Sequence, residues 1–303
     1  MQYAVCSNIY NILTNTNNEQ LLTNNEKPNT INNKPTIINQ AIGFLNTPPI
    51  WEHTQFGIKQ FNFPMVDLSD FAPAPIPENL RLGHQIEYLC KQLLEHSLLY
   101  EILVYNLPIR QEKQTLGEVD FILKDLKTEQ IIHVELTYKF YIIDLDISEP
   151  LHQLIGPNKR DAFFMKMEKI KNKQFALLHS EAGSKALADK NIAISNLVHQ
   201  TCFKTQLFKP FKVKTLQLEP LNENCIVGYW LRLSDFNTDS FTPYQFYIPS
   251  KKQWVLNPDT TNSWTSHADT LLKIGQHLVK QNSPLVWMKK SETEYEKFFV
   301  VWW

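Results

Sequence analysis

The spacing of apolar residues predicts a helix followed by three strands in the middle of the chain. An apolar stripe at helical spacing, which predicts an amphipathic helix of about four turns, is formed by Leu82, Ile86, Leu89 and Leu93. Strand-like runs follow at 101–109, 118–124 and 131–143, and a short polar segment joins the last two. We therefore expect the local order helix, strand, strand, strand.

The rest of the chain predicts a second helix over this sheet and a β-rich end. Residues 156–179 begin with a turn and continue as an amphipathic helix whose polar side is basic. From residue 202 onward, short aromatic and β-branched runs are interrupted by one more helical pattern at 266–282. The fold expected from this order is α/β of the α+β type, with a β-rich C-terminal part.

Composition divides the chain into three segments. Residues 1–39 are dominated by Asn and Thr and offer little apolar surface, so we expect a flexible extension. Residues 40–200 are expected to form the core, with a helical lead-in at its N-terminal end. Residues 201–303 are expected to form the β-rich part, packed on that core.

Carboxylates interrupt the second and third strand-like runs. Because side chains alternate along a strand, the acidic and apolar residues of the second run take opposite sides, namely Glu118 and Asp120 against Val119, Phe121 and Leu123. One face of the third run carries Glu135, Thr137 and Lys139. If the two runs form an antiparallel hairpin, Asp120 and Glu135 lie about 5 Å apart on neighbouring strands.

Two carboxylates at this separation repel unless a cation lies between them. Mg²⁺, or Mn²⁺ in its place, prefers oxygen ligands and completes its shell with water and phosphate oxygens. A nearby ammonium from Lys139 can then orient water or stabilise charge on the phosphate. Half-exposed strands also carry solvated Glu and Lys pairs, so spacing alone leaves the metal site and an ordinary cross-strand pair both open.

Charge and cysteine content exclude several classes of protein. The formal net charge is -1, which gives no support for nucleic-acid binding from overall charge. The four cysteines lack metal-ligand or redox spacing, so we expect a reduced cytoplasmic protein. No apolar run of about 18 residues occurs, and no membrane span is expected.

A local basic segment at 151–180 changes the picture of possible partners. Lys159 and Arg160 precede the expected helix, where free backbone N–H groups and basic side chains both favour phosphate. Nucleic acid, DNA or RNA, is therefore the expected partner, with these two residues contacting it. A solvated helix face is the alternative reading.

The order of the acids and the lysine resembles the PD-(D/E)XK nuclease core, and this resemblance implies a mixed central sheet flanked by helices. A helical acid, Glu87, is followed by Asp120 and then by Glu135, with a lysine on the same strand face. The usual motif places lysine two residues after the second acid, whereas here Thr137 holds that position and Lys139 follows two residues later. The resemblance implies that Asp120, Glu135 and Glu87 hold the metal and that Lys139 is catalytic.

A second resemblance covers most of the chain. Blocks such as "RLGHQIEYL", "TLGEVDFIL", "HVELTYKFYI" and "LIGPNKRDAFFMKMEKI" are similar, in this order, to the bacterial family catalogued as domain of unknown function 1853, from about Ala41 to about Pro258. This resemblance implies that the spacing from Glu135 to Lys139 is the family's own form of the motif.

The function expected from these observations is metal-dependent hydrolysis of phosphodiester bonds in DNA or RNA. Glu118, two residues before Asp120, either contacts metal or substrate or faces solvent. One alternative is a nuclease-fold protein that binds nucleic acid, or acts as a scaffold, without cleaving it. A small-molecule site is a third possibility, for which the sequence carries no P-loop, GxGxxG or HExxH fingerprint.

Overall fold

The computed structural model describes residues 37–259 and 262–303. The expected Asn-rich extension lies outside these residues, except for 37–39, which begin a helix. The α-helices are α2 (Ile37–Asn46), α3 (Leu82–Ser97), α4 (Phe163–Lys169), α5 (Glu181–Ala188), α6 (Leu233–Phe236) and α7 (His267–Val279). A π-helical turn, η2 (Ile170–Phe175), continues α4. Short 3₁₀ turns are η1 (Pro150–His152), η3 (Ile194–Asn196), η4 (Glu223–Cys225), η5 (Asp239–Phe241) and η6 (Lys251–Gln253).

The strands form one mixed sheet. Their bounds are β1 (Thr54–Gln55), β2 (Ile58–Gln60), β3 (Tyr100–Gln111), β4 (Gln114–Asp125), β5 (Ile131–Ile143), β6 (Leu154–Ile155), β7 (Leu197–Pro210), β8 (Ile226–Arg232), β9 (Gln245–Tyr247), β10 (Leu285–Lys289) and β11 (Tyr295–Val301). The main order is β3-β4-β5-β7-β8-β11-β10-β9. Strands β5, β7, β8 and β11 are parallel to their neighbours within this group, and antiparallel strands flank them on both sides. The expected α+β fold with a mixed central sheet flanked by helices is confirmed.

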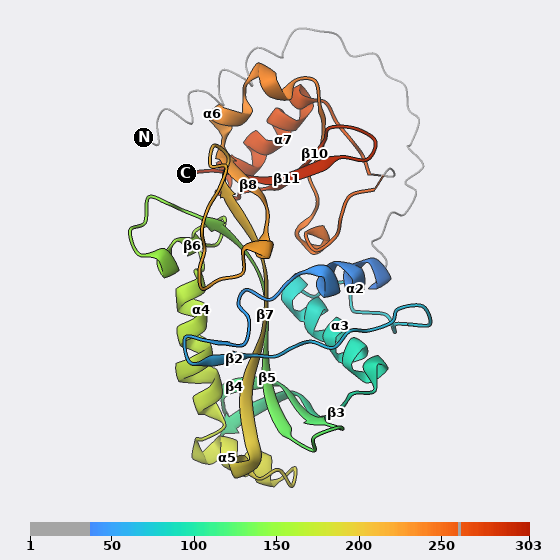
Figure 1. Cartoon of the computed structure of the whole chain (residues 1–303), viewed down its shortest axis with the longest axis vertical. Coiled ribbons are helices and arrows are strands. Elements are labelled where there is room, and N and C mark those ends of the chain that lie inside the picture. Colours follow the sequence, from blue (N-terminus) through green and yellow to red (C-terminus); the bar gives the residue numbers. More distant parts are fainter. Residues whose placement is uncertain (1–36, 260–261) are drawn as a thin grey trace.

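Helices cover both faces of the long β5 and β7 pair. Figure 1 shows α4 on one side of these strands and α2 and α3 on the other. Helices α6 and α7 lie beside β8, β10 and β11, near the C-terminus. The boundary expected at residues 200 and 201 falls within β7, so both expected parts share this sheet.

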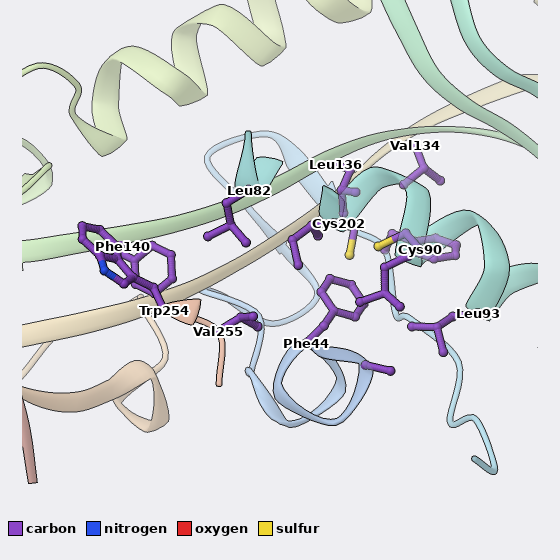
Figure 2. Close-up of a cluster of buried hydrophobic side chains, with 14 of the residues drawn as sticks. Phe44, Leu82, Cys90, Leu93, Val134, Leu136, Phe140, Cys202, Trp254 and Val255 are labelled. Atoms are coloured by element: carbon purple, nitrogen blue, oxygen red, sulfur yellow. The ribbon is translucent and has the colours of Figure 1, made fainter. Parts of the chain in front are cut away.

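Strand β5 is buried on both faces, which explains its nearly continuous apolar sequence. Its even-numbered residues point toward α2 and α3, where Leu136 and Phe140 pack with Phe44 and with the apolar stripe of α3 (Figure 2). Its odd-numbered residues Tyr141 and Ile143 pack with Phe163 of α4. Glu135 therefore lies on the α4 face.

A chain of hydrogen bonds crosses the α2 and α3 face. Lys297 Nζ donates to Gln206 Oε1 at 2.8 Å, and Gln206 Nε2 donates to the Tyr138 hydroxyl at 2.9 Å. Tyr138 contacts Thr47 Oγ1 at 2.7 Å, and Thr47 Oγ1 donates to the carbonyl oxygen of Gly43 at 2.8 Å. Each side chain donates to the next one in the series, and the last donates to the backbone of α2. The network therefore links β11, β7 and β5 to α2.

No helix in residues 37–259 or 262–303 is both long enough and apolar enough to cross a bilayer.

Candidate functional site

Asp120 and Glu135 lie opposite each other where β4 and β5 separate. The antiparallel register pairs Phe121 with Val134, and one further step in the same register would pair Asp120 with Glu135. The backbone ladder stops before that step. Instead, the backbone N–H of Leu136 donates to Asp120 Oδ2 at 2.8 Å. The structure thus brings the two expected carboxylates together at the end of a ladder.

The same row extends across the neighbouring strands. Asn106 of β3 stands opposite Asp120, in a left-handed conformation with φ 48°, and the β3–β4 pairing skips this position. Its buried Oδ1 atom has no hydrogen-bond partner. On the other side, Thr201 of β7 pairs with Glu135 and donates from Oγ1 to its backbone carbonyl at 2.8 Å. A polar row therefore crosses four strands.

The interruption at this row changes the faces expected for β4. Phe121 and Leu123 pack with α3, but Val119 packs with Leu178 and Leu187 in a separate cluster beside α5. The expectation that Val119 shares a face with Phe121 is therefore wrong. Strict alternation requires an unbroken ladder, and this ladder is broken at Asp120.

Glu135 is fully buried and held at both carboxylate oxygens. His133 Nε2 contacts Oε1 at 2.9 Å, and Gln174 Nε2 of the π-helical turn donates to Oε2. Burial raises the pKa of Glu135 above its ordinary range, although the charge of Lys166 and hydrogen bonds with Asp120 and Gln174 oppose the rise. Its orientation is fixed before any ligand arrives.

The pKa of Asp120 is also raised above its ordinary value. Burial raises its pKa, the charge of Glu135 raises it further, and the Leu136 N–H bond and Lys166 act in the opposite direction. A half-buried carboxylate and a fully buried one in contact cannot both ionise without a large cost in free energy. The pair therefore favours a shared proton or a cation.

Lys166 of α4 lies within electrostatic range of both acids and is linked to Glu135 through Gln174, not directly. The carboxylates of Glu135 and Asp120 act to raise its pKa, while burial, the larger influence, lowers it. Lys166 Nζ donates to Gln174 Oε1 at 3.1 Å, which links it to Glu135. In a continuous α-helix, residues eight positions apart would be rotated by about 80°. The wider winding of η2 brings Gln174 onto the face of Lys166.

Lys139, the expected catalytic lysine, is engaged elsewhere. Its Nζ donates to Asp161 Oδ2 at 2.7 Å, and the side chain is 36% exposed. At the usual motif position, Thr137 is buried and its Oγ1 has no hydrogen-bond partner. The sequence did not reveal Lys166, because its approach depends on how α4 crosses the sheet.

Glu87, expected as a third ligand, lies at the edge of this group. Its Oε2 contacts His84 Nδ1 at 3.0 Å, and its charge contributes to the raised pKa of Asp120. Glu118 is exposed and pairs in register with Pro108 of β3.

The two residues expected to contact substrate, Lys159 and Arg160, lie on the turn before α4. Both are exposed, and the helix itself begins only at Phe163. Lys159 Nζ lies 3.6 Å from the ring centroid of Trp303. These residues are therefore on the surface, apart from the buried carboxylates.

A chain of three histidines leads from Glu135 to the surface. His133 Nδ1 lies 2.8 Å from His199 Nδ1, and His199 Nε2 lies 2.8 Å from the exposed His179 Nε2. Burial lowers the pKa of His133 to about 3 and that of His199 to about 4, so both rings are neutral. Neutral imidazole has one donor and one acceptor nitrogen, so His133 donates to Glu135 when the carboxylate is ionised, and the donor direction along the chain can reverse only when Glu135 is protonated. The parallel register that pairs His133 with His199 was not evident from the sequence.

The donor set fits a hard cation through two carboxylates. Within the described part of the chain, no group of three or more His, Cys, Asp or Glu side chains is arranged to hold a metal ion. Mg²⁺ commonly uses only one or two protein carboxylates beside waters and phosphate oxygens, so Asp120 and Glu135 suffice. The unpaired oxygens of Asn106 and Thr137 are further polar atoms available near these strands.

Comparisons with known proteins identify a family. Searches of curated proteins and of solved structures returned no match. A family model matches residues 58–301, which begins later and ends later than the range expected from the sequence blocks. It covers most of the chain, including β8 to β11. The chain belongs to the family described as Domain of unknown function (DUF1853).

Proposed function

We propose that this chain hydrolyses phosphodiester bonds of DNA or RNA with a divalent cation held by Asp120 and Glu135. The observation that carries the proposal is the pair itself, two carboxylates packed together on neighbouring strands with raised pKa values. Carboxylates with strongly raised pKa values destabilise a fold at neutral pH, and such groups are commonest at functional sites. The resemblance to PD-(D/E)XK nucleases supports the same assignment.

Mg²⁺ or Mn²⁺ would be held by the carboxylates of Asp120 and Glu135. When bound, such a cation polarises a phosphoryl oxygen and favours ionisation of water. His133 and Gln174 each engage one oxygen of Glu135, and a carboxylate oxygen that accepts one hydrogen bond keeps a second lone pair for a cation. These partners also fix the rotamer of the carboxylate, as outer-shell groups do in metal sites.

Lys166 is proposed to do what the sequence assigned to Lys139. It is an electrostatic neighbour of both acids, and Gln174 holds its ammonium in place. A positioned ammonium in a partly buried site stabilises negative charge that develops on a phosphoryl group. Lys139 forms an ion pair with Asp161 and is not assigned to this step.

A second candidate function is nucleic-acid binding or scaffolding without cleavage. Thr137 at the motif position, together with the ion-paired Lys139, favours this reading if Lys166 contributes nothing. Cleavage by the wild-type chain separates the two candidates, because the binding or scaffold protein associates with nucleic acid without hydrolysing it.

Cleavage of labelled single- and double-stranded DNA and of RNA, with Mg²⁺, Mn²⁺ or a chelator, tests the proposal. Asp120→Asn and Lys166→Met are expected to lower the rate by about 10²–10³. Lys139→Met is the matched lysine control and should stay within about fivefold at saturating substrate, since its lost charge affects binding more than chemistry. Equal rates for Lys166→Met and wild type would reject the assignment of Lys166, and cleavage that survives in Asp120→Asn would reject the site.

A further inference from the structure

Basic side chains from four separate segments gather around Asp161. We call this group the basic surface, and it consists of Arg81, Lys139, Lys159, Arg160 and Lys251. Burial lowers the pKa of Lys251 and the charge of Asp161 opposes this, while the charges of Lys139, Arg160 and Arg81 each add a smaller lowering. These three cations therefore lie within electrostatic range of Lys251, and Asp161 pairs directly with Lys139.

Two indoles hold lysines of this surface in place. Lys159 Nζ lies over the Trp303 ring at 3.6 Å, and Trp303 Nε1 donates to the carbonyl oxygen of Pro157 at 3.2 Å. Lys251 Nζ lies 5.4 Å from the ring of Trp254. Cation–π contacts restrict long flexible side chains, so less entropy is lost when these ammonium groups bind an anion.

The N-terminus of α3 adds partial positive charge to the same place. Arg81 is the N-cap residue, its side chain makes no cap hydrogen bond, and the first turn of this 16-residue helix has no acidic residue. The first N–H groups of the helix are thus left for an external acceptor. Arg81 also carries its own charge to this end of the helix.

Lys139 connects the basic surface to the candidate site. Its charge acts on Lys251 on one side and on Lys166 on the other. Lys166 in turn lies within electrostatic range of Asp120 and Glu135. Lys139, although paired with Asp161, therefore lies within electrostatic range of both the basic surface and Lys166.

We propose that the basic surface binds the phosphodiester backbone of a nucleic acid and leads one strand to Lys166. This inference rests on the proposed function, because it takes the polyanion to be the substrate of the site. Contacts to phosphate carry no sequence information, so binding is expected to be independent of sequence. Trp303 is occupied by Lys159 on the ring and by Trp230 at 5.3 Å, which leaves it a support for the lysine and not a platform for bases.

Anisotropy titrations of labelled single- and double-stranded oligonucleotides in a chelator measure binding without cleavage. The double variant Arg160→Glu/Lys251→Glu is expected to bind at least about tenfold more weakly than wild type. It should also flatten the slope of log affinity against log salt by about 1.5, as expected when two phosphate contacts are lost. Lys212→Glu is the matched control, since Lys212 is 80% exposed and pairs with Asp235 away from this group, and it should change affinity less than twofold.

The outcomes separate this inference from the proposed function. Normal affinity and salt slope in the double variant, with unchanged thermal stability, would overturn the basic surface even if the chain cleaves nucleic acid. Weakened binding in the double variant supports it even if wild type proves unable to cleave. Binding to anionic lipid vesicles that exceeds binding to nucleic acid, and that the double variant abolishes, would assign the surface to a membrane and overturn the inference.

Discussion

Two groups of polar residues lie against β5, one on each face, and they differ in how completely their atoms are paired. On the α2 and α3 face, every side chain in the hydrogen-bonded series from Lys297 to Thr47 has at least one partner. On the α4 face, Asp120 and Glu135 have raised pKa values and Thr137 Oγ1 has no partner. Complete pairing stabilises a fold, whereas buried atoms left unpaired lower stability and invite a ligand.

The largest expected effect is a gain of stability on removing one charge from the candidate site. Asp120 ionises at higher pH in the folded than in the unfolded chain, so the fold favours its protonated form. The cost of ionising it is absent below about pH 4 and grows as pH rises toward about 8. Asp120→Asn keeps an oxygen for the Leu136 N–H and should raise the unfolding free energy on the order of 4 kcal/mol at about pH 8.

Urea unfolding of wild type and Asp120→Asn across this pH range measures the effect. Excess Mg²⁺ should stabilise wild type at the alkaline end and leave the variant unchanged, because ligand that binds only the native state adds to its stability. A variant that is less stable than wild type at every pH would mean that Asp120 belongs to a paired structural network, as Tyr138 does.

The second effect concerns Lys297, on the α2 and α3 face. Its contribution to stability changes with pH in the opposite direction to that of Asp120. Burial lowers the pKa of Lys297 to about 8, below its unfolded value of 10.5. The unfolded chain then binds more protons between these values, so wild-type stability should rise by about 3 kcal/mol from pH 8 to pH 10.5.

Lys297→Met should abolish this rise of stability with pH. Urea unfolding of wild type and variant at several pH values measures the difference. At neutral pH the variant should gain about 1–2 kcal/mol, less than the full charge term, because Gln206 Oε1 loses its donor. Nucleic-acid cleavage should be unchanged. A wild-type stability that stays flat between pH 8 and pH 10.5 would show that Lys297 is not buried as a charge.

The sequence predicted the scaffold of the site better than its chemistry. The run at 131–143 coincides with β5, and the apolar stripe of α3 packs as expected, because both follow from local periodicity. The proximity of Asp120 and Glu135 followed from alternation and an antiparallel hairpin. Local pattern was sufficient wherever neighbouring segments pair with each other.

The remaining site residues depend on contacts between distant segments. Lys166 comes within electrostatic range of the acids because α4 packs on the sheet. The π-helical turn that continues α4 places Gln174 between Lys166 and Glu135. Asn106 has a left-handed backbone conformation that the neighbouring residues in the sequence do not predict. His133 meets His199 only through a parallel pairing across a long crossover. No local spacing encodes these three relationships.

The third effect compares adjacent residues of β5 that face opposite groups. Tyr138→Phe should lower the unfolding free energy by about 2 kcal/mol, because Gln206 Nε2 and Thr47 Oγ1 both lose a buried partner. Thr137→Val has nearly the same shape as wild type and removes a hydroxyl without a partner, so it should be neutral or slightly stabilising. Thermal unfolding of both variants measures the contrast, and equal destabilisation would mean that Thr137 Oγ1 is hydrogen-bonded in solution.

The smallest effect is expected at Lys139, and it distinguishes that residue from Lys166. The ion pair with Asp161 is about two-fifths exposed at both ends, so Lys139→Met should change stability by less than about 1 kcal/mol. Cleavage at saturating nucleic acid should persist, but affinity should fall by about threefold at low salt and by less as salt is added, because the loss is electrostatic. If Lys139→Met instead abolished cleavage at saturation while Lys166→Met did not, the ammonium that serves the acids would come from the strand and not from α4. The ion pair with Asp161 would then have to open during turnover, and Asp161→Asn, which frees Lys139, would be expected to raise the rate.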